Sequence, residues 1–422
     1  METDAAVTRC PQCDKQLRVD PRYVTWCDSC EWNVDPLPVD DAYPAWRQKL
    51  EHRLADTLYR ELEHGTIHKP GWDAARAMAY FLSFLVLLLP LVALAAGITI
   101  LLFYRPLWLA VPFAAVGFAI AWSLRPRPQR LDPDQLHVSR AEVPRLYNLL
   151  DEISAAVKAR PVASVVLTAE PELWITEIGW RMRPVVGIGL PLWVAMSSQQ
   201  RVAVLAHEFG HGRNGDIRNN TLVWNAENIL EELESSFSPQ PYDELKDDAA
   251  ALVEDTDGTF LTRLVNAIVG PPIRGYRWLL TRASLRGEQR AEYLADRISG
   301  EVAGSEAAAT SLERLVIVET AYRALEKALR FGSDVEPLDA VRRAVSDIPA
   351  REIDRRIRTT RVRETRTDST HPPTYLRVKL IRARPTTTAK VVLGLSDSAT
   401  IDRELAAAGA PALTELRRSF GR

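Results

Sequence analysis

Two uninterrupted apolar runs stand out from the mixed pattern of hydrophobic and polar positions along the chain. Residues 78–104 carry no charged side chain, and a second uncharged run, 107–124, follows directly after Arg105-Pro106. Each run is long enough to cross a hydrocarbon core of about 30 Å as a helix. Aromatic residues of the kind that gather at membrane interfaces lie near the run ends, namely Tyr80, Tyr104, Trp108 and Trp122. The pattern predicts a two-helix transmembrane hairpin over 78–124, with a helical hairpin inside a protein core as the alternative.

Charges around this hairpin predict its orientation. The turn between the two runs contains Arg105 alone, whereas several basic residues lie on the outer flanks, namely Lys69, Arg76, Arg125, Arg127 and Arg130. Cytoplasmic flanks of membrane spans carry an excess of Lys and Arg. We therefore expect a multi-pass cell-membrane protein, in contact with membrane lipid, whose N-terminus and large C-terminal part both face the cytoplasm.

Outside the two runs, the hydrophobic period alternates between that of helices and that of strands. Residues 44–66 carry an apolar helical stripe that predicts an amphipathic linker helix, and 143–157 predicts a further helix. Residues 164–168 are typical of a strand. A second strand is expected at 185–190, where glycines would suit an edge strand that pairs with an extended peptide. The pattern as a whole predicts a mostly helical α+β fold.

The later part of the chain gives weaker structural signals. Acidic residues dominate 227–257, which predicts a mobile insertion. Residues 260–280 are apolar but include arginines and Pro271-Pro272, which favours a pair of core or membrane-surface helices over a further span. The tail at 386–422 predicts a small C-terminal extension with a strand-like run at 391–395.

The main chemical signal is the string His207-Glu208-Phe209-Gly210-His211. On a helix, positions i and i+4 share one face, so both imidazoles can bind one metal ion while Glu208 takes a proton from a metal-bound water. Two imidazoles, a third protein ligand and an open fourth position describe a catalytic zinc site. The alternative is a chance match, in which two partly buried histidines make ordinary hydrogen bonds.

A third ligand is expected from the helical stretch 287–296. Glu292 and Asp296 are four residues apart and hence on one face, where Glu292 could bind the metal and Asp296 could hold the outer N–H group of a ligand histidine. Glu288, one turn earlier, is a competing ligand. A solvated acidic helix face is the alternative for the whole stretch.

These motifs together resemble the gluzincin family of membrane metalloendopeptidases that contains HtpX and the CAAX prenyl endoprotease. In that family an Asn-Gly-Asp, here 214–216, follows the His-Glu-x-x-His helix. Next comes Glu-(Tyr/Phe)-x-Ala-Asp, here 292–296, and last Thr-His-Pro-Pro-x-x-x-Arg, here 370–377. The resemblance covers about 135–381, and the main departure lies at 173–180, which bears on substrate preference.

The resemblance implies a zincin-like metallopeptidase domain over 132–385. It implies a zinc ion held by His207, His211 and Glu292, the last in preference to Glu288. By the same resemblance, the remaining site residues are Glu208 as the base, His371 as a donor to the oxyanion or a substrate-positioning group, Asp296 beside the ligands, and Asp216 and Arg377 in structural roles. The residues alone leave a second interpretation of His371, that of a turn residue before two prolines.

The four cysteines lie within residues 1–38, in the pairs Cys10-Pro11-Gln12-Cys13 and Cys27-Asp28-Ser29-Cys30. Two such pairs are typical of a zinc ribbon, in which four thiolates bind a structural zinc ion. Two disulfides are the alternative, which a reducing cytoplasm disfavours. The chain is thus expected to bind two zinc ions. A ribbon can bind protein or nucleic acid, and its partner is not indicated.

The formal charge of −2 is close to balance and gives no reason to expect a nucleic-acid partner. We therefore expect a membrane-anchored zinc endopeptidase acting on a peptide or protein substrate, with a role in membrane-protein quality control. Two alternatives are a membrane-tethered zinc-ribbon scaffold with a vestigial peptidase domain, and a zinc hydrolase for a non-peptide bond. Glu208 argues against the scaffold, because a scaffold needs no base.

Overall fold

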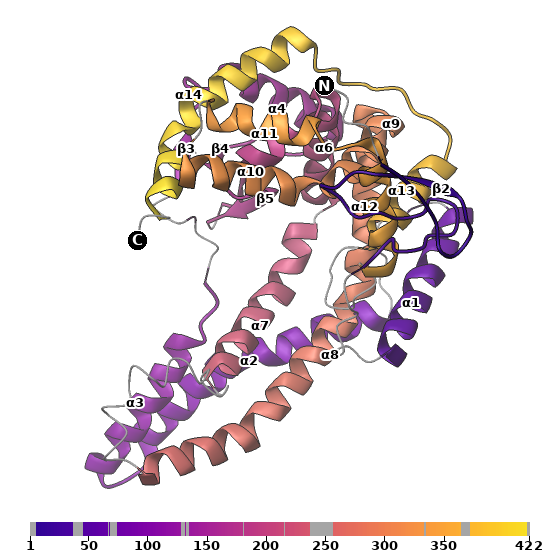
Figure 1. Ribbon diagram of the computed structural model, residues 1–422. Coiled ribbons are helices and arrows are strands. Elements are labelled where there is room, and N and C mark those ends of the chain that lie inside the picture. Colours follow the sequence, from indigo (N-terminus) through magenta and orange to yellow (C-terminus); the bar gives the residue numbers. More distant parts are fainter. Residues whose placement is uncertain are drawn as a thin grey trace. The chain divides into compact units, whose positions relative to one another are not determined.

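The chain forms two compact units in a computed structural model (Figure 1). The large unit comprises Met1–Lys69, Gln129–Gly215 and Gln289–Arg422, and the small unit comprises Pro70–Pro128 and Asp216–Glu288. The structure describes residues 6–36, 45–65, 67, 74–127, 131, 135–179, 181–214, 216–236, 256–332, 335–363 and 372–419.

The two apolar runs form two helices of the small unit. These are α2 (Ala74–Phe103) and α3 (Leu107–Ser123). Among the described residues, α2 is the one helix both long and apolar enough to cross a membrane, whereas α3 is apolar but shorter. Both helices lie where the sequence predicts them, and the two-span topology stays a prediction.

Small residues form the contact between α2 and α3. A Cβ added at Gly117 would lie 3.0 Å from the carbonyl oxygen of Ala93, and one added at Gly97 would lie 2.9 Å from the ring of Phe118. The two backbones therefore approach more closely than larger residues would allow. Large apolar side chains on the same two helices are exposed, among them Phe81, Phe84, Leu91, Val92, Leu102, Trp108 and Phe113.

Two further helices of the small unit, α7 (Asp216–Ser236) and the first part of α8 (Thr256–Ala303), pack with α2. They share one cluster of buried apolar side chains, which includes Ala79, Leu82, Val86, Val223, Ala226, Ile229, Leu230 and Leu280. Helix α7 includes the first ten residues of the predicted acidic insertion at 227–257, so residues 227–236 are helical. Residues 237–255 lie outside the described part of the chain.

Helix α8 runs without a break through Pro271-Pro272, so the predicted helix pair over 260–280 is wrong. A proline fits the helical φ, and its cost of about 3 kcal/mol comes from the missing N–H and a clash with the preceding turn. Packing offsets that cost, because Ile273 and Tyr276 contact the apolar cluster. The Tyr276 hydroxyl also donates to the carbonyl oxygen of Leu82 at 2.7 Å.

A four-stranded sheet with the order β3-β4-β6-β5 forms one layer of the large unit. The strands are β3 (Leu136–Val138), β4 (Ser164–Thr168), β5 (Leu173–Ile178) and β6 (Arg183–Gly189). Strand β6 pairs in parallel with β4 and antiparallel with β5, so β6 is central and β5 lies at the edge.

The prediction that 185–190 forms an edge strand is therefore wrong. Its glycines allow close packing inside the sheet, because a Cβ at Gly187 would overlap the ring of Trp174 on β5. A Cβ at Gly189 would likewise overlap the backbone oxygen of Glu170. These glycines therefore make room for other parts of the same chain and not for a substrate. Gly187 makes room for strand β5, and Gly189 for the loop that precedes β5.

Helices surround this sheet and share its apolar core. Those in the first half of the large unit are α1 (Ala45–His64), α4 (Pro144–Val157), α5 (Leu190–Ala195) and α6 (Ser198–Asn214). Those that follow α8 are α9 (Ser305–Leu315), α10 (Val318–Phe331), α11 (Pro337–Ser346), α12 (Ala350–Arg363), α13 (Thr374–Ala383) and α14 (Leu395–Ser419). Helix α1, where the sequence predicts a linker, packs on α13 and holds Arg290 of α8 through Glu61 at 2.7 Å.

The C-terminal tail supports the start of α6. Within residues 386–419 the structure has no strand at 391–395. There, the backbone N–H of Val391 instead donates to the carbonyl oxygen of Val302, and Leu393 pairs with the side chain of Gln199. Helix α14 is one long helix, and its Asp402 pairs with the buried guanidinium of Arg201 at 2.8 Å. The tail thus fixes the N-terminal turns of the helix that carries His207.

Candidate functional site

A side chain from the first turn caps the start of helix α6. The backbone N–H of Ser197 donates to the Oε1 atom of Gln200 at 2.9 Å, which satisfies one of the free donors at the helix start. Val202, Leu205 and Phe209 are buried on the core side. A Cβ at Gly210 would lie 3.1 Å from the Cα atom of Ala295, so the missing side chain lets α6 approach the C-terminal part of α8 closely.

The donor groups of three residues from these two helices converge on one point. The Nε2 atoms of His207 and His211 are 3.3 Å apart. The carboxylate oxygens of Glu292 lie 3.4 Å from His207 Nε2 and 3.3 Å from His211 Nε2. Tetrahedral ligands around zinc at about 2.0–2.1 Å lie about 3.3–3.4 Å from one another. The spacing of the three donors therefore fits a zinc ion with one further position to fill.

The same geometry separates the two candidate third ligands. Among the described residues, the group of potential donors that contains His207 and His211 includes Glu292 and does not include Glu288. Glu292 is buried, with 5 % of its surface exposed. A buried carboxylate needs a neighbouring cation, because an unneutralised charge loses its hydration. Arg377 provides one such cation beside Glu292, and a metal ion held by the two imidazoles and this carboxylate would provide a second.

Asp296 and Arg377 contact the donor group, which consists of His207, His211 and Glu292. Asp296 Oδ1 lies 3.0 Å from His207 Nδ1, and the same carboxylate receives two hydrogen bonds from Arg377 at 2.7 and 2.8 Å. Arg377 also lies 3.2 Å from Glu292 Oε2. Burial alone would raise the pKa of Asp296, but Arg377 and His207 hold that pKa below its ordinary value. The ionised Asp296 accepts from Nδ1–H, so Nε2 of His207 is left to face a metal.

A pocket of about 450 Å³ opens beside His207 and Glu208. Glu208 lies next to His207 on α6 and lines this pocket, as the base of a hydrolase would. Leu173 at the start of β5 lines it as well. The remaining wall is mostly apolar and includes Leu192, Val204, Ala308, Leu312 and Leu315, with Ser299, Ser311 and Thr374 as polar members.

Two predicted site residues cannot be placed. His371 lies outside the described residues, and Asp216 begins the backbone of α7 without a described side chain. Sequence reasoning also missed residues that the structure brings to the site. The part of the pocket wall formed by α9 contains no recognisable motif. Ser299 follows Glu292 by two helical turns, and its hydroxyl donates to the carbonyl oxygen of Ala203 at 2.7 Å.

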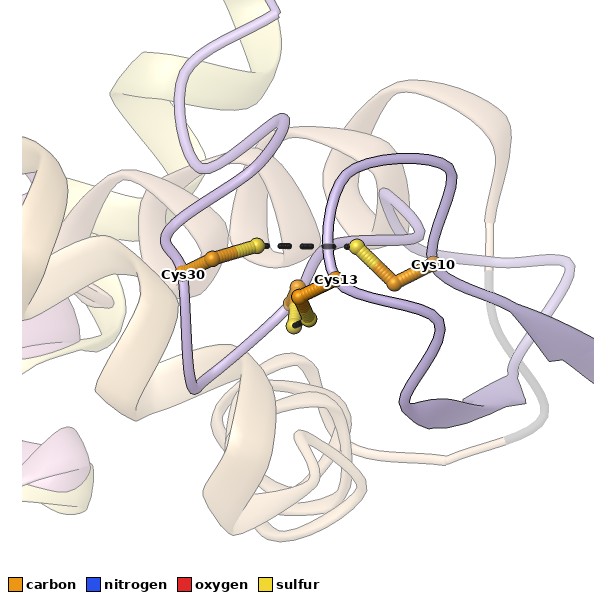
Figure 2. Close-up of side chains that lie close together, drawn as sticks. Cys10, Cys13 and Cys30 are labelled. Atoms are coloured by element: carbon orange, nitrogen blue, oxygen red, sulfur yellow. Dashed lines mark hydrogen bonds between the residues drawn. The ribbon is translucent and has the colours of Figure 1, made fainter.

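The four cysteines also converge, at a second place in the large unit. Figure 2 shows the side chains of Cys10 and Cys30 pointing toward one another from two loops. The sulfur atoms of Cys10 and Cys30 are 3.5 Å apart, as are those of Cys13 and Cys27, and all four lie within 4.8 Å of one another. Four thiolates around zinc at about 2.3 Å would be about 3.8 Å apart. The thiols are free, and the spacing fits a closed metal site and excludes disulfide bonds in this structure.

The two cysteine loops repeat one backbone pattern. The N–H of Cys10 donates to the carbonyl oxygen of Lys15, and the N–H of Cys27 donates to that of Trp32. Asp14 and Glu31, each directly after the second cysteine of its pair, have φ angles of 58° and 59°. A left-handed residue at that position turns the chain back over the sulfurs. The two loops therefore share these backbone features, and the first of them connects the paired strands β1 (Ala6–Arg9) and β2 (Gln16–Val19).

Comparison with known proteins adds one family. Residues 178–385 match the model of Peptidase family M48, and this range includes His207, His211 and Glu292 as well as Asp296 and Arg377. This match confirms the resemblance drawn from the motifs. No curated protein and no solved structure shows a significant match to the chain.

Proposed function

Because residues 178–385 place this chain in peptidase family M48, a family of zinc metallopeptidases, we propose that it is a membrane-anchored zinc endopeptidase. The observation that carries the proposal is the spacing of the donor atoms of His207, His211 and Glu292, which matches three corners of a zinc tetrahedron. A second zinc ion is proposed for the four cysteines, where the closed donor set gives it a structural role.

Each residue of the site has a proposed task in the reaction. A bound zinc ion would act as a Lewis acid and lower the pKa of a water molecule. Glu208 accepts the proton of the attacking water and passes it to the departing amine. Asp296 holds the His207 ring in the tautomer that leaves Nε2 free. His371, by family resemblance, donates to the oxyanion or positions the substrate.

The edge strand supports a peptide as the substrate. Within the described part of the sheet, β5 pairs on one side only, with β6. An extended peptide can add to such an edge through main-chain hydrogen bonds. Leu173 at the start of β5 also lines the pocket beside Glu208, so a peptide on this edge can reach the pocket with a side chain. The largely apolar wall would accept a hydrophobic one.

Membrane anchoring is supported by the packing of α2 and α3. Their contact is made by Gly97 and Gly117, while large apolar side chains are exposed. A helix pair buried in a protein core would cover its large side chains, whereas in a bilayer small residues allow close helix contact and lipid covers the large ones. Flanking basic residues favour a cytoplasmic peptidase domain, where damaged membrane proteins would be available as substrates.

The test uses the full chain purified in detergent, with an unfolded soluble protein and a misfolded membrane protein as substrates. Glu208→Gln should keep the catalytic zinc, since Glu208 is not a ligand, while cleavage falls by about 10²- to 10⁴-fold. A zinc-free variant, or one that cleaves as fast as the wild type, would contradict the assignment. A chain that binds zinc but cleaves neither substrate would favour the scaffold alternative.

A further inference from the structure

The largest buried side chain of the ribbon does not belong to the ribbon's own core. That core is small and consists of Cys10, Leu17 and Cys27 with partly buried neighbours. Trp26, directly before Cys27, has 1 % of its surface exposed. Two guanidinium groups of α12 lie over its ring, those of Arg351 and Arg358, at 5.5 and 5.2 Å from the ring centre. Helix α12 therefore provides part of the cover of Trp26.

The second cysteine loop, residues 26–34, is held by arginines of α12 through its backbone. Arg358 donates to the carbonyl oxygen of Asp28 at 2.9 Å, and Arg355 donates to that of Val34 at 2.8 Å. Arg351 donates to the carbonyl oxygen of Trp26. These carbonyl groups lie at both ends of the loop and between its two cysteines. Their positions depend on the shape of the loop, and that shape is fixed when Cys27 and Cys30 bind one ion.

Charge complementarity strengthens this contact. The sequence of α12 has six arginines against Glu352 and Asp354. Glu31, the left-handed residue after Cys30, pairs with both Arg358 and Arg361. An arginine-rich helix gains from these acceptors because carbonyl and carboxylate oxygens replace the water around its guanidinium groups.

Helix α12 connects this contact with the catalytic side of the large unit. It packs on α13, the helix that carries Arg377. Its own buried carboxylate, Glu352, pairs with Arg355 and Arg356, and Arg356 donates to the hydroxyl of Thr320 at 2.7 Å. The ribbon therefore lies on a helix that contacts α13, the helix that carries Arg377.

We propose that the second cysteine loop is a metal-dependent clamp whose partner is α12 of the same chain. With an ion at the four thiolates, the loop presents the carbonyl oxygens of Trp26, Asp28 and Val34 in the spacing that the α12 arginines bind. Without the ion the loop loses its shape, because a core this small cannot hold it, and α12 is released. This inference concerns the cysteine site and stands apart from the proposed peptidase activity.

The clamp predicts a reciprocal coupling, since an ion that favours the docked loop must itself be favoured by docking. The Arg355→Ala/Arg358→Ala double variant leaves every thiol in place. It should weaken ion binding at the cysteines by about tenfold or more, because two charge-assisted hydrogen bonds are lost. The measurement is competition for zinc with a chromogenic chelator on the full chain. Arg22→Ala, on the ribbon but paired with Asp20, is the control and should leave the affinity unchanged.

The second arm follows α12 itself by amide hydrogen exchange. In the Cys27→Ser/Cys30→Ser variant, exchange over 350–363 should rise by about tenfold or more, while α4 stays protected as in the wild type. Should the variant lose protection throughout, the zinc affinity of the arginine double variant decides, because all four of its thiols are intact. Unchanged exchange over α12 in the cysteine variant, or unchanged zinc affinity in the arginine variant, would overturn the clamp. Neither readout depends on peptide cleavage.

Discussion

The carboxylate of Asp296 lies 3.0 Å from Nδ1 of His207, one helical turn beyond Glu292, the proposed third ligand. Arg377 donates two hydrogen bonds to the same carboxylate. Asp296 therefore accepts hydrogen bonds from the guanidinium of Arg377 and from the imidazole of His207. All three side chains are largely buried. A change at Asp296 would therefore act on the proposed metal ligand His207 without removing it.

Asp296→Asn is expected to weaken binding of the catalytic zinc by about 10- to 100-fold, as the loss of such a supporting partner does. The amide keeps the shape of the carboxylate, but it leaves the charge of Arg377 with Glu292 as its main counter-charge. Zinc affinity is measured by chelator competition. Asp339→Asn, an exposed residue of α11 that pairs with Arg342, is the matched control and should bind zinc as the wild type does. Equal affinity in both variants would remove Asp296 from the site.

The third ligand is tested by a pair of substitutions one helical turn apart. Glu292→Ala should lose the catalytic zinc, because two imidazoles alone hold the ion weakly, whereas Glu288→Ala should keep it. Metal content per chain after dialysis distinguishes the two. The reverse result would mean that the converging oxygens of Glu292 are not the ligands.

The close approach of α6 and α8 is tested at two glycines of the same helix. Gly210→Ala puts a Cβ 3.1 Å from the backbone of Ala295 and should lower the melting temperature, since such overpacking costs about 1–3 kcal/mol. Nothing lies within 4 Å of a Cβ at Gly212. Gly212→Ala should therefore stabilise the protein by about 0.5–1 kcal/mol, the usual gain from replacing a helical glycine. A stabilising Gly210→Ala would show that the helices can separate at little cost.

The proposed topology is tested by reporter fusions after Asp40 and after Pro133, on either side of the apolar hairpin. Both fusions should report the cytoplasm, because basic residues flank both outer ends. A periplasmic or extracellular signal from one fusion would mean that α3, the shorter apolar helix, does not complete a second span.

The motifs predicted the candidate site better than the periodicity predicted the fold around it. His207, His211 and Glu292 were all identified from spacing and family resemblance, since helical geometry fixes which residues share a face. The pocket wall from α9 was missed because Ala308 and Leu312 have the pattern of any buried helix. The spacing of residues in the sequence predicts which side chains share a face of one helix, but it does not predict which helices contact one another.

The errors in the fold have a common origin in glycine and proline. Gly187 and Gly189 indicated close backbone approach correctly, but the neighbour proved to be the chain's own Trp174 and its preceding loop. Pro271-Pro272 suggested a break that packing of α8 overrides. In both places the glycine or proline has the local effect expected of it, and contacts with other elements determine the structure that results.

The position of β5 at the edge of the sheet bears on how substrates would be selected. Main-chain pairing on an edge strand is open to almost any sequence, but it requires a segment that has given up its own helix or sheet. A protein in its native state keeps such segments folded, whereas a damaged one exposes them. If the chain cleaves proteins as proposed, its discrimination would rest on the conformational state of the target, so that a loss of folding, more than any cleavage motif, would mark a protein for degradation.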